Sequence, residues 1–343
     1  MSRPWFLLLV AALATGTAAA RKPAPVAYAE RTEVRAFAAD LALRRGLDRG
    51  WVLAQVARAQ KQAAVQRLIM PGPPGAPKNW SAYRERFVEP QRIAAGLAFW
   101  EAHQGLLERA EQRFGVPAAI VAGVVGVETY YGRVTGNFRV VDALVTLGFD
   151  FPGGRSDRSA YFRGELEEFL VLARREGLDP QTQRGSFAGA VGLPQFMPGS
   201  INRFAVDFDG DGRIDLQASA ADAIGSVANY LAVHGWLRGE PARYGVGVPG
   251  DPADLAVLLA PDILPSFSAA QFVERGATLS ASARAHEGLL ALVMVENGSA
   301  APSYVAGTQN FYALTRYNRS SYYALAVIEL GEAVQAAWER ARR

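Results

Sequence analysis

Cysteine is absent from this chain of 343 residues, and histidine occurs only three times. Without cysteine there is no disulfide framework, no thiol nucleophile and no residue near the N-terminus to carry a lipid. His103, His234 and His286 stand in unrelated places, so we expect neither a histidine metal cluster nor a catalytic triad. The net charge of +3 is far below the footprint of a nucleic-acid-binding protein, and no zinc-finger spacing or phosphate loop is present. We expect no nucleic-acid partner and no organic cofactor.

Near the N-terminus the apolar run, Trp5–Leu13, is too short for a membrane-spanning helix. Arg3 precedes this run, and small residues that end in Ala18–Ala20 follow it before a basic pair. The pattern predicts a secretory signal over residues 1–20, cleaved near Ala20. An uncleaved anchor is the alternative. The mature protein is therefore expected to be soluble and exported, without a lipid anchor.

Most of the chain has the apolar spacing of amphipathic helices. The expected helices span 31–45, 48–70, 90–114, 117–132, 160–176, 222–234 and 322–342. Frequent glycine and proline, alternating with apolar runs at Ala256–Leu259 and Leu289–Val295, predict a small sheet-containing insertion over 241–302. The proline-rich stretch 71–77 predicts a loop between helices, and residues 21–28 read as a short disordered lead.

The stretch from Pro117 to Gly132 is almost wholly apolar and predicts a buried helix. Glu128 is its one charged residue and lies on the same side as Val121 and Val124. Burial of a lone carboxylate disfavours its charged form and raises its pKa, which suits a general acid near neutral pH. A buried glutamate satisfied by an arginine or by the backbone is the structural alternative.

A second run, Gly185–Pro198, combines small residues with Ser186 and Gln195. Such a composition predicts tight turns that present polar side chains. The amide of Gln195 can donate and accept hydrogen bonds, which suits sugar hydroxyl and acetamido groups. The structural alternative is a plain glycine-rich connection, and the spacing fits no phosphate loop.

A third run, Asp207–Asp215, has aspartates at positions one, three and five, a glycine at six and an apolar residue at eight, as in an EF-hand loop. Position twelve is Ala218 in place of glutamate, and Asp222 is the next carboxylate that could close the site. An Asp/Gly hairpin turn is the alternative. A bound calcium ion is favoured over this alternative, because neighbouring carboxylates repel one another without a cation. Magnesium would fit the loop less well.

A fourth run, Asn310–Tyr323, mixes aromatic side chains with amides. Rings can lie against the C–H faces of sugars, and amides can bind hydroxyl groups. Tyrosines at helical spacing are more often part of a core or its rim, so this run is weak evidence by itself.

Together these segments resemble the membrane-bound lytic murein transglycosylase B family, whose lysozyme-like members cut the glycan strands of bacterial peptidoglycan. The similarity runs from about residue 79 to the C-terminus. Its markers are Val125–Gly132, Gly185–Pro198, Asp207–Asp215, Asp222–Tyr230 and Asn310–Asn318. The resemblance implies a mainly α (α+β) fold with a lysozyme-like catalytic core. Because the lipid-bearing cysteine is missing, it implies a soluble relative.

The resemblance also implies roles for individual residues, with Glu128 as the single catalytic acid. The residues implied to hold the sugars or position the acid are Ser186, Gln195, Tyr230, Tyr317, Asn318 and Tyr323. Arg158 is implied as a basic residue that contacts peptide or sugar, after a loop built differently from the family's. The implied structural calcium site consists of Asp207, Asp209, Asp211, the carbonyl of Arg213, and Asp222. Pro194 stands where the family usually has a small or flexible residue, which leaves the Gln195 loop geometry open.

We expect five parts in the chain. A signal peptide at 1–20 precedes an N-terminal helical part at 21–114. A lysozyme-like catalytic core with an EF-hand-like loop spans 115–240, and the small β-containing insertion spans 241–302. A C-terminal cleft segment and closing helix occupy 303–343.

The expected reaction is lytic transglycosylation of the MurNAc–GlcNAc β-1,4 bond. Glu128 protonates the bridging oxygen and then takes the proton of the sugar's own C6 hydroxyl, which leaves a 1,6-anhydromuramoyl end. One carboxylate suffices because the nucleophile belongs to the substrate, whereas ordinary glycosidases use two. The alternatives are a hydrolytic muramidase, in which Asp142, Asp150 or Asp157 assists water, and a non-catalytic, calcium-stabilised wall-binding protein. Besides glycan strands, cell-wall synthesis machinery is an expected partner of this monomer.

Overall fold

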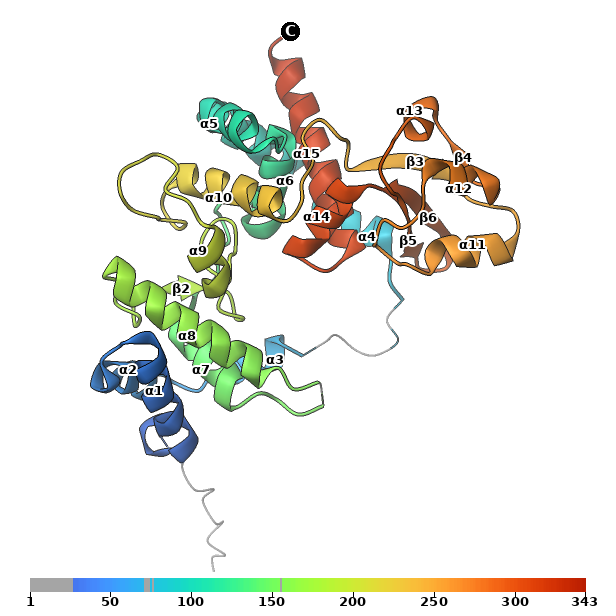
Figure 1. The fold of residues 1–343 in the computed structure, drawn as a ribbon. Coiled ribbons are helices and arrows are strands. Elements are labelled where there is room, and N and C mark those ends of the chain that lie inside the picture. The colour runs from blue at the N-terminus through green and yellow to red at the C-terminus, as the bar shows by residue number, and fades with distance from the viewer. Residues whose placement is uncertain (1–26, 71–74, 76, 155) are drawn as a thin grey trace, which may run out of the picture.

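The computed structural model describes residues 27–70, 75, 77–154 and 156–343. The predicted signal peptide and most of the predicted loop at 71–77 lie outside the described residues. The described chain is mainly helical, with two small antiparallel sheets (Figure 1). The prediction of a mainly α (α+β) fold is confirmed.

The N-terminal part is wholly helical. Its elements are η1 (Tyr28–Glu30), α1 (Thr32–Arg45), α2 (Arg49–Ala57), α3 (Ala63–Leu68) and α4 (Trp80–Glu85). Helix α1 ends as predicted at Gly46, which has a left-handed φ of 65°. Tyr28 is buried, so the expected disordered lead does not extend to this residue.

The prediction of one helix over 48–70 is wrong. Its start is confirmed, because the Asp48 side chain accepts a hydrogen bond from the Trp51 N–H. The helix is interrupted between α2 and α3, where the N–H groups of Gln60 and Gln62 donate to the side chains of Asp142 and Thr146. These tertiary hydrogen bonds replace those that a continuous helix would make. The local sequence gives no sign of this replacement.

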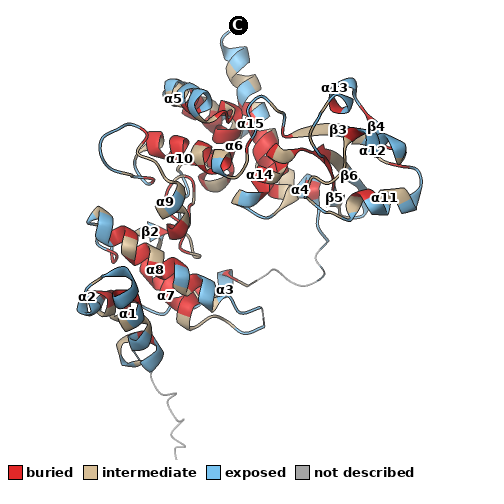
Figure 2. Ribbon diagram, viewed as in Figure 1, coloured by how far each residue is buried: buried red, intermediate tan, exposed pale blue. Residues whose placement is uncertain are grey.

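A group of packed helices forms the centre of the molecule. Its members are α5 (Pro90–Phe114), α6 (Ala118–Thr129), α10 (Ala220–Val233), α14 (Gln309–Tyr317) and α15 (Ser321–Ala341). Helices α6 and α15 approach closely at two glycines. A Cβ on Gly123 would lie 2.2 Å from the Val327 carbonyl oxygen, and a Cβ on Gly331 would lie 2.2 Å from that of Ala119. Figure 2 shows how consistently α6 is buried among its neighbours.

A second helical group contains α7 (Val140–Phe149), α8 (Ser159–Glu176) and α9 (Pro198–Phe204). Strands β1 (Phe138–Arg139) and β2 (Arg184–Gly185) pair antiparallel beside it. Helices α7 and α9 were not predicted. Nearly all of α7 is buried, so its sequence has no polar face to reveal a helical period. Helix α9 is too short to show one.

The small sheet-containing part is confirmed, although its limits differ from the prediction. Its elements are β3 (Arg243–Gly247), α11 (Pro252–Leu259), α12 (Ala269–Glu274), β4 (Thr278–Leu279), α13 (Ala281–Arg284), β5 (Ala291–Asn297) and β6 (Ala300–Gly307), with strand order β4-β3-β6-β5. The apolar run Ala256–Leu259 lies in helix α11, because Asp251 caps that helix and Pro252 starts it. The last strand continues past residue 302 to Gly307.

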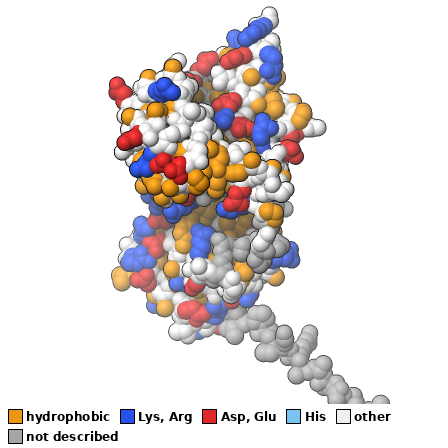
Figure 3. Space-filling view, turned by 90° about the vertical axis from the view of Figure 1, so that its right-hand side faces the viewer, with side chains coloured by type: hydrophobic (Ala, Val, Ile, Leu, Met, Phe, Trp, Pro, Cys, Tyr) orange, Lys and Arg blue, Asp and Glu red, His pale blue; other side chains and the backbone are white. Residues whose placement is uncertain are grey.

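This part has a small core of its own, which includes Leu258, Phe272 and Leu292. Larger hydrophobic side chains such as Leu264 and Leu289 are exposed there. Figure 3 looks at this side of the molecule and shows hydrophobic side chains gathered on the surface. Among the described residues, no helix combines the length and the apolar character needed to cross a membrane.

Candidate active site

Glu128 lies in the last turn of α6, one of the most completely buried helices of the described chain. Pro117 is the N-cap of this helix rather than part of its first turn. The helix ends before the predicted stop at Gly132, because Tyr130 and Tyr131 both adopt left-handed backbone with φ of 54° and 57°. Such backbone is unfavourable for tyrosine, so surrounding contacts must hold it in place.

Those contacts come from α5 and from α6 itself. A Cβ on Gly96 would lie 2.4 Å from the Tyr131 hydroxyl oxygen, and a Cβ on Gly126 would lie 2.5 Å from it. Arg92 donates a hydrogen bond of 2.7 Å to the Gly126 carbonyl and lies 4.3 Å above the Tyr130 ring. A cation at a helix C-terminus also complements the helix dipole. The end of α6, and with it the acid, is therefore fixed from several sides.

The carboxyl group of Glu128 has one hydrogen-bond partner in the described chain. The hydroxyl of Tyr323, in the first turn of α15, donates to Oε1 over 2.7 Å. Burial raises the pKa of Glu128 from 4.5 to about 7, and the Tyr323 hydrogen bond opposes that rise. None of the described ion pairs involves Glu128, so the alternative of an arginine-paired glutamate is not supported. The carboxyl group keeps its proton close to neutral pH, as a general acid requires.

An aromatic cluster lies behind the acid. The Tyr317 and Tyr323 rings are stacked with centroids 6.1 Å apart, and Tyr230 meets Tyr317 edge-on at 4.9 Å. The Tyr230 hydroxyl donates to the Arg316 carbonyl at 2.7 Å. The Tyr317 hydroxyl donates to the Pro194 carbonyl at 2.5 Å. Both hydroxyl protons are therefore used to hold backbone segments together, and burial beside Glu128 raises the pKa of Tyr317 and Tyr323.

Ser186 follows β2 and stabilises a tight turn. Its Oγ accepts hydrogen bonds from the N–H groups of Ala190 at 3.0 Å and Ala188 at 3.3 Å. Since a serine hydroxyl has one proton and two acceptor positions, this geometry leaves its proton available to a ligand. The prediction that this stretch forms tight turns is confirmed.

Gln195 also sits in a turn, with a left-handed φ of 50°. Its Nε2 donates to the carbonyls of Gly192 at 2.8 Å and Thr135 at 3.0 Å. These bonds orient the amide and leave its oxygen as an acceptor. Pro194 is accommodated in the turn and offers its carbonyl to Tyr317.

Thr129 connects the catalytic helix to this turn, a role that we did not predict. The side chain is fully buried, and its hydroxyl lies 2.9 Å from the Leu193 carbonyl. The Leu193 N–H in turn donates to the Leu216 carbonyl at 2.8 Å, at the exit of the acidic loop. The acid, the Gln195 turn and the acidic loop are thus joined by two hydrogen bonds. A threonine next to the acid gives no sequence signal of such a connection.

Tyr83 of α4 is a second aromatic residue near the acid that sequence reasoning missed. Burial raises its pKa, and the charge of Glu128 raises it further. Its ring stacks on Trp80 at 6.3 Å and meets Tyr322 edge-on at 5.8 Å. The sequence signal that could have indicated Tyr83 was its spacing of three residues from Trp80, after the proline-rich loop.

Two further predicted residues lie at the surface. Asn318 is the C-cap of α14 and is exposed. Arg158 is the N-cap of α8, and its guanidinium lies 4.7 Å above the Tyr161 ring. No described contact joins either side chain to Glu128.

The acidic loop brings three predicted ligands together. One carboxylate oxygen from each of Asp207, Asp209 and Asp211 lies within 4.8 Å of the others. Asp207 also accepts from the N–H groups of Gly210 at 2.7 Å and Gly212 at 2.9 Å, which shapes the loop. Oxygen ligands in a partly exposed loop suit Ca²⁺, which takes six to eight of them. The residues present fit such an ion.

Asp222 is placed differently from the other predicted ligands. It is 1% exposed, and its two oxygens accept from the N–H groups of Phe208 and Asp215, each at 2.8 Å. These bonds join the beginning and the end of the loop to α10. Asp222 therefore supports the loop, and its role as a direct ligand stays a prediction, as does that of the Arg213 carbonyl.

Comparison with known proteins assigns the chain to the transglycosylase class of enzymes. The family described as "Transglycosylase SLT domain" matches residues 29–332. The chain belongs to this family of lytic transglycosylases.

Individual relatives agree with this assignment. The chain is 38% identical over 320 residues to the membrane-bound lytic murein transglycosylase B of Escherichia coli K12, covering 90% of this chain and 84% of that protein. The soluble lytic transglycosylase SltB1 of Pseudomonas aeruginosa superposes with a TM-score of 0.80 at 37% identity, covering 89% of this chain and 99% of that one.

Two further solved structures contain ligands. An Escherichia coli lytic transglycosylase in complex with calcium has a TM-score of 0.79 and 38% identity, covering 91% of this chain and 95% of that one. SltB3 of Pseudomonas aeruginosa in complex with NAG-NAM-pentapeptide has a TM-score of 0.74 and 28% identity, covering 88% of this chain and 79% of that one.

Proposed function

We propose that this chain cleaves the β-1,4 bond between MurNAc and GlcNAc in peptidoglycan and leaves 1,6-anhydromuramoyl ends. The observation that carries the proposal is the buried carboxyl group of Glu128, whose one hydrogen-bond partner in the described chain is the neutral Tyr323 hydroxyl. Glu128 donates its proton to the bridging oxygen as the bond to C1 breaks. The carboxylate then accepts the proton of the C6 hydroxyl, whose oxygen bonds to C1. No water is consumed, and Glu128 ends the cycle protonated.

The surroundings of the acid suit both halves of this cycle. A buried carboxyl group with a pKa of about 7 can give and take a proton near neutral pH. The hydrogen bond from the Tyr323 hydroxyl strengthens when Glu128 ionises, because hydrogen bonds to an ionised acceptor are stronger than neutral ones. Tyr323 therefore acts as a positioning residue.

The hydrolytic alternative needs a second carboxylate for water, and the three candidates are engaged elsewhere. Asp142 forms an ion pair with Arg139 at 2.8 Å and accepts from the Gln60 N–H. Asp157 accepts from the N–H and the hydroxyl of Ser159. In the described chain, burial and the Tyr323 hydrogen bond account for the pKa shift of Glu128, and no other carboxylate contributes to it.

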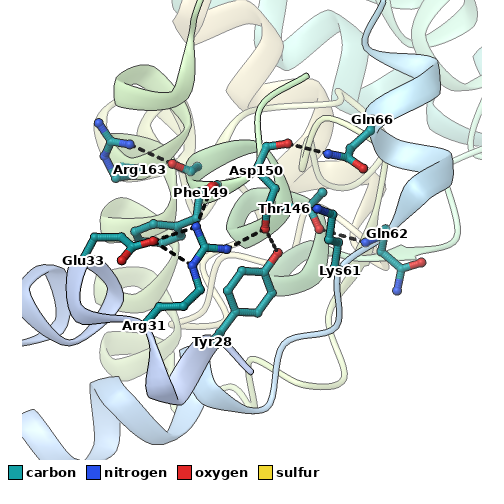
Figure 4. Close-up of polar contacts among 11 residues, drawn as sticks. Tyr28, Arg31, Glu33, Lys61, Gln62, Gln66, Thr146, Phe149, Asp150 and Arg163 are labelled. Atoms are coloured by element: carbon teal, nitrogen blue, oxygen red, sulfur yellow. Dashed lines mark hydrogen bonds and ion pairs between the residues drawn. The ribbon is translucent and has the colours of Figure 1, made fainter. Parts of the chain in front are cut away.

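Asp150 is the third candidate, and Figure 4 shows its surroundings. Its carboxylate accepts from the Tyr28 hydroxyl at 2.7 Å and forms ion pairs with Arg31 at 2.9 Å and Lys61 at 3.1 Å. This network holds the N-terminal segment against α7. A carboxylate bound in this way is a poor base for water, which favours attack by the substrate's own hydroxyl group.

The sugar-binding roles are part of the proposal. Ser186 offers a hydroxyl proton and Gln195 an amide oxygen, which are the groups that sugar hydroxyl and acetamido groups need. Asn318 contributes an exposed amide, and Arg158 an exposed cation. We assign Tyr230 and Tyr317 to support of the backbone, since their protons are already used.

We further propose that the acidic loop binds a structural calcium ion through Asp207, Asp209 and Asp211, as a relative was solved with calcium. When bound, the ion would offset the repulsion among these carboxylates and stiffen the loop. The ion would have a structural role, and Glu128 would carry out the proton transfers.

The proposed place of action is the periplasm, where peptidoglycan lies. The Escherichia coli K12 relative is named as membrane-bound, whereas the sequence of this chain contains no cysteine that could carry a lipid. We propose an exported protein that works as a monomer on glycan strands and meets cell-wall synthesis machinery. The five-part division of the chain, with its catalytic core at 115–240, likewise stays a proposal.

The decisive experiment is mass spectrometry of purified peptidoglycan digested with the protein, beside a Glu128→Gln control. We expect anhydromuropeptides that are lost in the control. Reducing-end products would instead establish hydrolysis. No release by the folded wild-type protein would contradict the proposed activity.

A further inference from the structure

A pocket of about 420 Å³ opens where the start of α4 meets the start of α15. Its lining residues are Pro77, Lys78, Asn79, Ala82, Tyr83, Arg86, Ser320 and Tyr322. The wall combines two aromatic rings with two cations, and none of the lining residues is acidic. This combination would favour a ligand that carries negative charge beside apolar groups.

The two cations of this pocket have no ion-pair partner in the described chain. Lys78 and Arg86 are both exposed, and neither takes part in a described ion pair. Arg84 of α4, which lies between them in the sequence, is different because it pairs with Glu329 of α15. Two unpaired cations on one small pocket raise the local positive potential and attract anions.

The pocket adjoins the catalytic acid. The Tyr83 hydroxyl experiences the charges of both Glu128 and Arg86, of which the first raises its pKa and the second lowers it. On the other wall, Ser320 caps α15 through the N–H of Tyr323, the residue whose hydroxyl donates to Glu128. A ligand in the pocket would therefore lie next to a glycan at the acid.

We propose that this pocket binds the acidic peptide carried by the glycan substrate, with Lys78 and Arg86 facing its carboxylates. The Tyr83 and Tyr322 rings would pack against its apolar side chains. The inference rests on the proposed function, because a peptide that branches from a sugar beside the broken bond needs an adjoining, positively charged cavity. Burial and Tyr323 set the pKa of Glu128, so the two cations serve recognition rather than proton transfer.

The test compares two substrates of the same glycan length. One retains its peptides, and the other has been stripped of them by an amidase. For the double variant Lys78→Gln/Arg86→Gln, we expect kcat/KM on peptide-bearing strands, relative to stripped strands, to fall about 5- to 10-fold, mainly through KM. The matched control Arg340→Gln/Arg343→Gln removes the same charge at the exposed end of α15 and should keep the wild-type ratio.

Each other outcome overturns the proposal. An unchanged ratio would show that the pocket does not recognise the peptide. Equal losses on both substrates would assign the two cations to the glycan or to the fold. An equal change in the control pair would show a general charge effect.

A binding measurement separates this inference from the proposed activity. In a Glu128→Gln background, calorimetry with a disaccharide-peptide and with the same disaccharide without peptide needs no turnover. We expect the peptide to strengthen binding only when Lys78 and Arg86 are present. If the wild-type protein cleaves nothing but this difference persists, the proposed activity fails and the pocket assignment holds. No difference would overturn the pocket assignment.

Discussion

Glu128 and Glu167 are both partly or fully buried glutamates on helices, yet their surroundings shift their pKa values in opposite directions. Glu167 of α8 accepts from Arg44 at 2.6 Å and from Arg45 at 2.5 Å. These hydrogen bonds lower its pKa against the effect of burial. Among the described residues, Glu128 has only the Tyr323 hydroxyl as a hydrogen-bond partner, and burial raises its pKa to about 7. The first arrangement holds α1 against α8, and the second keeps a proton available for chemistry.

The difference shows that burial alone does not make a catalytic acid. Ion pairs with arginine turn a buried carboxylate into a structural link. A neutral hydroxyl does not offset the free-energy cost of ionising a buried carboxyl group. We test this contrast between Glu128 and Glu167 with four predictions, beginning with the largest expected effect.

Exchanging each glutamate for glutamine should separate the two roles. Glu128→Gln should lower kcat by about 10³-fold or more, because the proton donor is lost. Glu167→Gln should keep kcat within about twofold and lower the Tm by about 2–4 °C. Anhydromuropeptide release and thermal unfolding measure the two effects. Strong loss of activity in a folded Glu167→Gln protein would break the contrast.

The acidic loop offers a third environment, in which carboxylates lie close together and take part in none of the described ion pairs. Calcium at about 100 times its Kd should stabilise the wild-type protein by about 2.7 kcal/mol, and a chelator should remove this gain. Asp209→Asn should weaken the response, whereas Asp262→Asn, in another turn, should retain it. Thermal unfolding at several calcium concentrations provides the measurement. An unchanged Tm on chelation would contradict a bound ion.

The raised pKa of Glu128 also predicts how stability depends on pH. The folded state holds the proton more tightly than the unfolded state, so this group costs stability as pH rises from about 4.5 through about 7. Glu128→Gln removes that cost. The variant should match the wild-type protein near pH 4.5 and exceed it by about 1–3 kcal/mol at pH 8. Denaturant unfolding at both pH values tests this, and a constant difference would contradict the assigned pKa shift.

Two tyrosine–carboxylate bonds allow a finer comparison. Tyr323→Phe should lower kcat about tenfold and move the basic limb of its pH profile upward, because the lost hydrogen bond had lowered the pKa of Glu128. Tyr28→Phe removes the equivalent bond to Asp150 and should leave the profile unchanged. A downward shift in the Tyr323 variant, or an equal shift in both, would show that the bond does not tune the acid.

Much of this fold could be predicted from the chain itself. Helix α5 has the predicted bounds. Helix α1 differs from its prediction by one residue at its start, and α15 by one residue at each end, because caps and apolar spacing are local properties. The break between α2 and α3 could not be predicted, since it depends on hydrogen bonds to α7. Neither could α7 itself, whose burial on all sides removes the helical pattern.

For the site, the sequence by itself determined that a lone glutamate would lie on an apolar helix and that aspartates would lie close together in one loop. Only the tertiary structure decided that Tyr323 is the partner of Glu128 and that Thr129 joins the helix to the Gln195 turn. It also decided that Asp222 accepts hydrogen bonds from the N–H groups of Phe208 and Asp215. The physical reason is that helix formation and loop chemistry depend on neighbours in sequence, whereas a pKa depends on every group that packing brings near it.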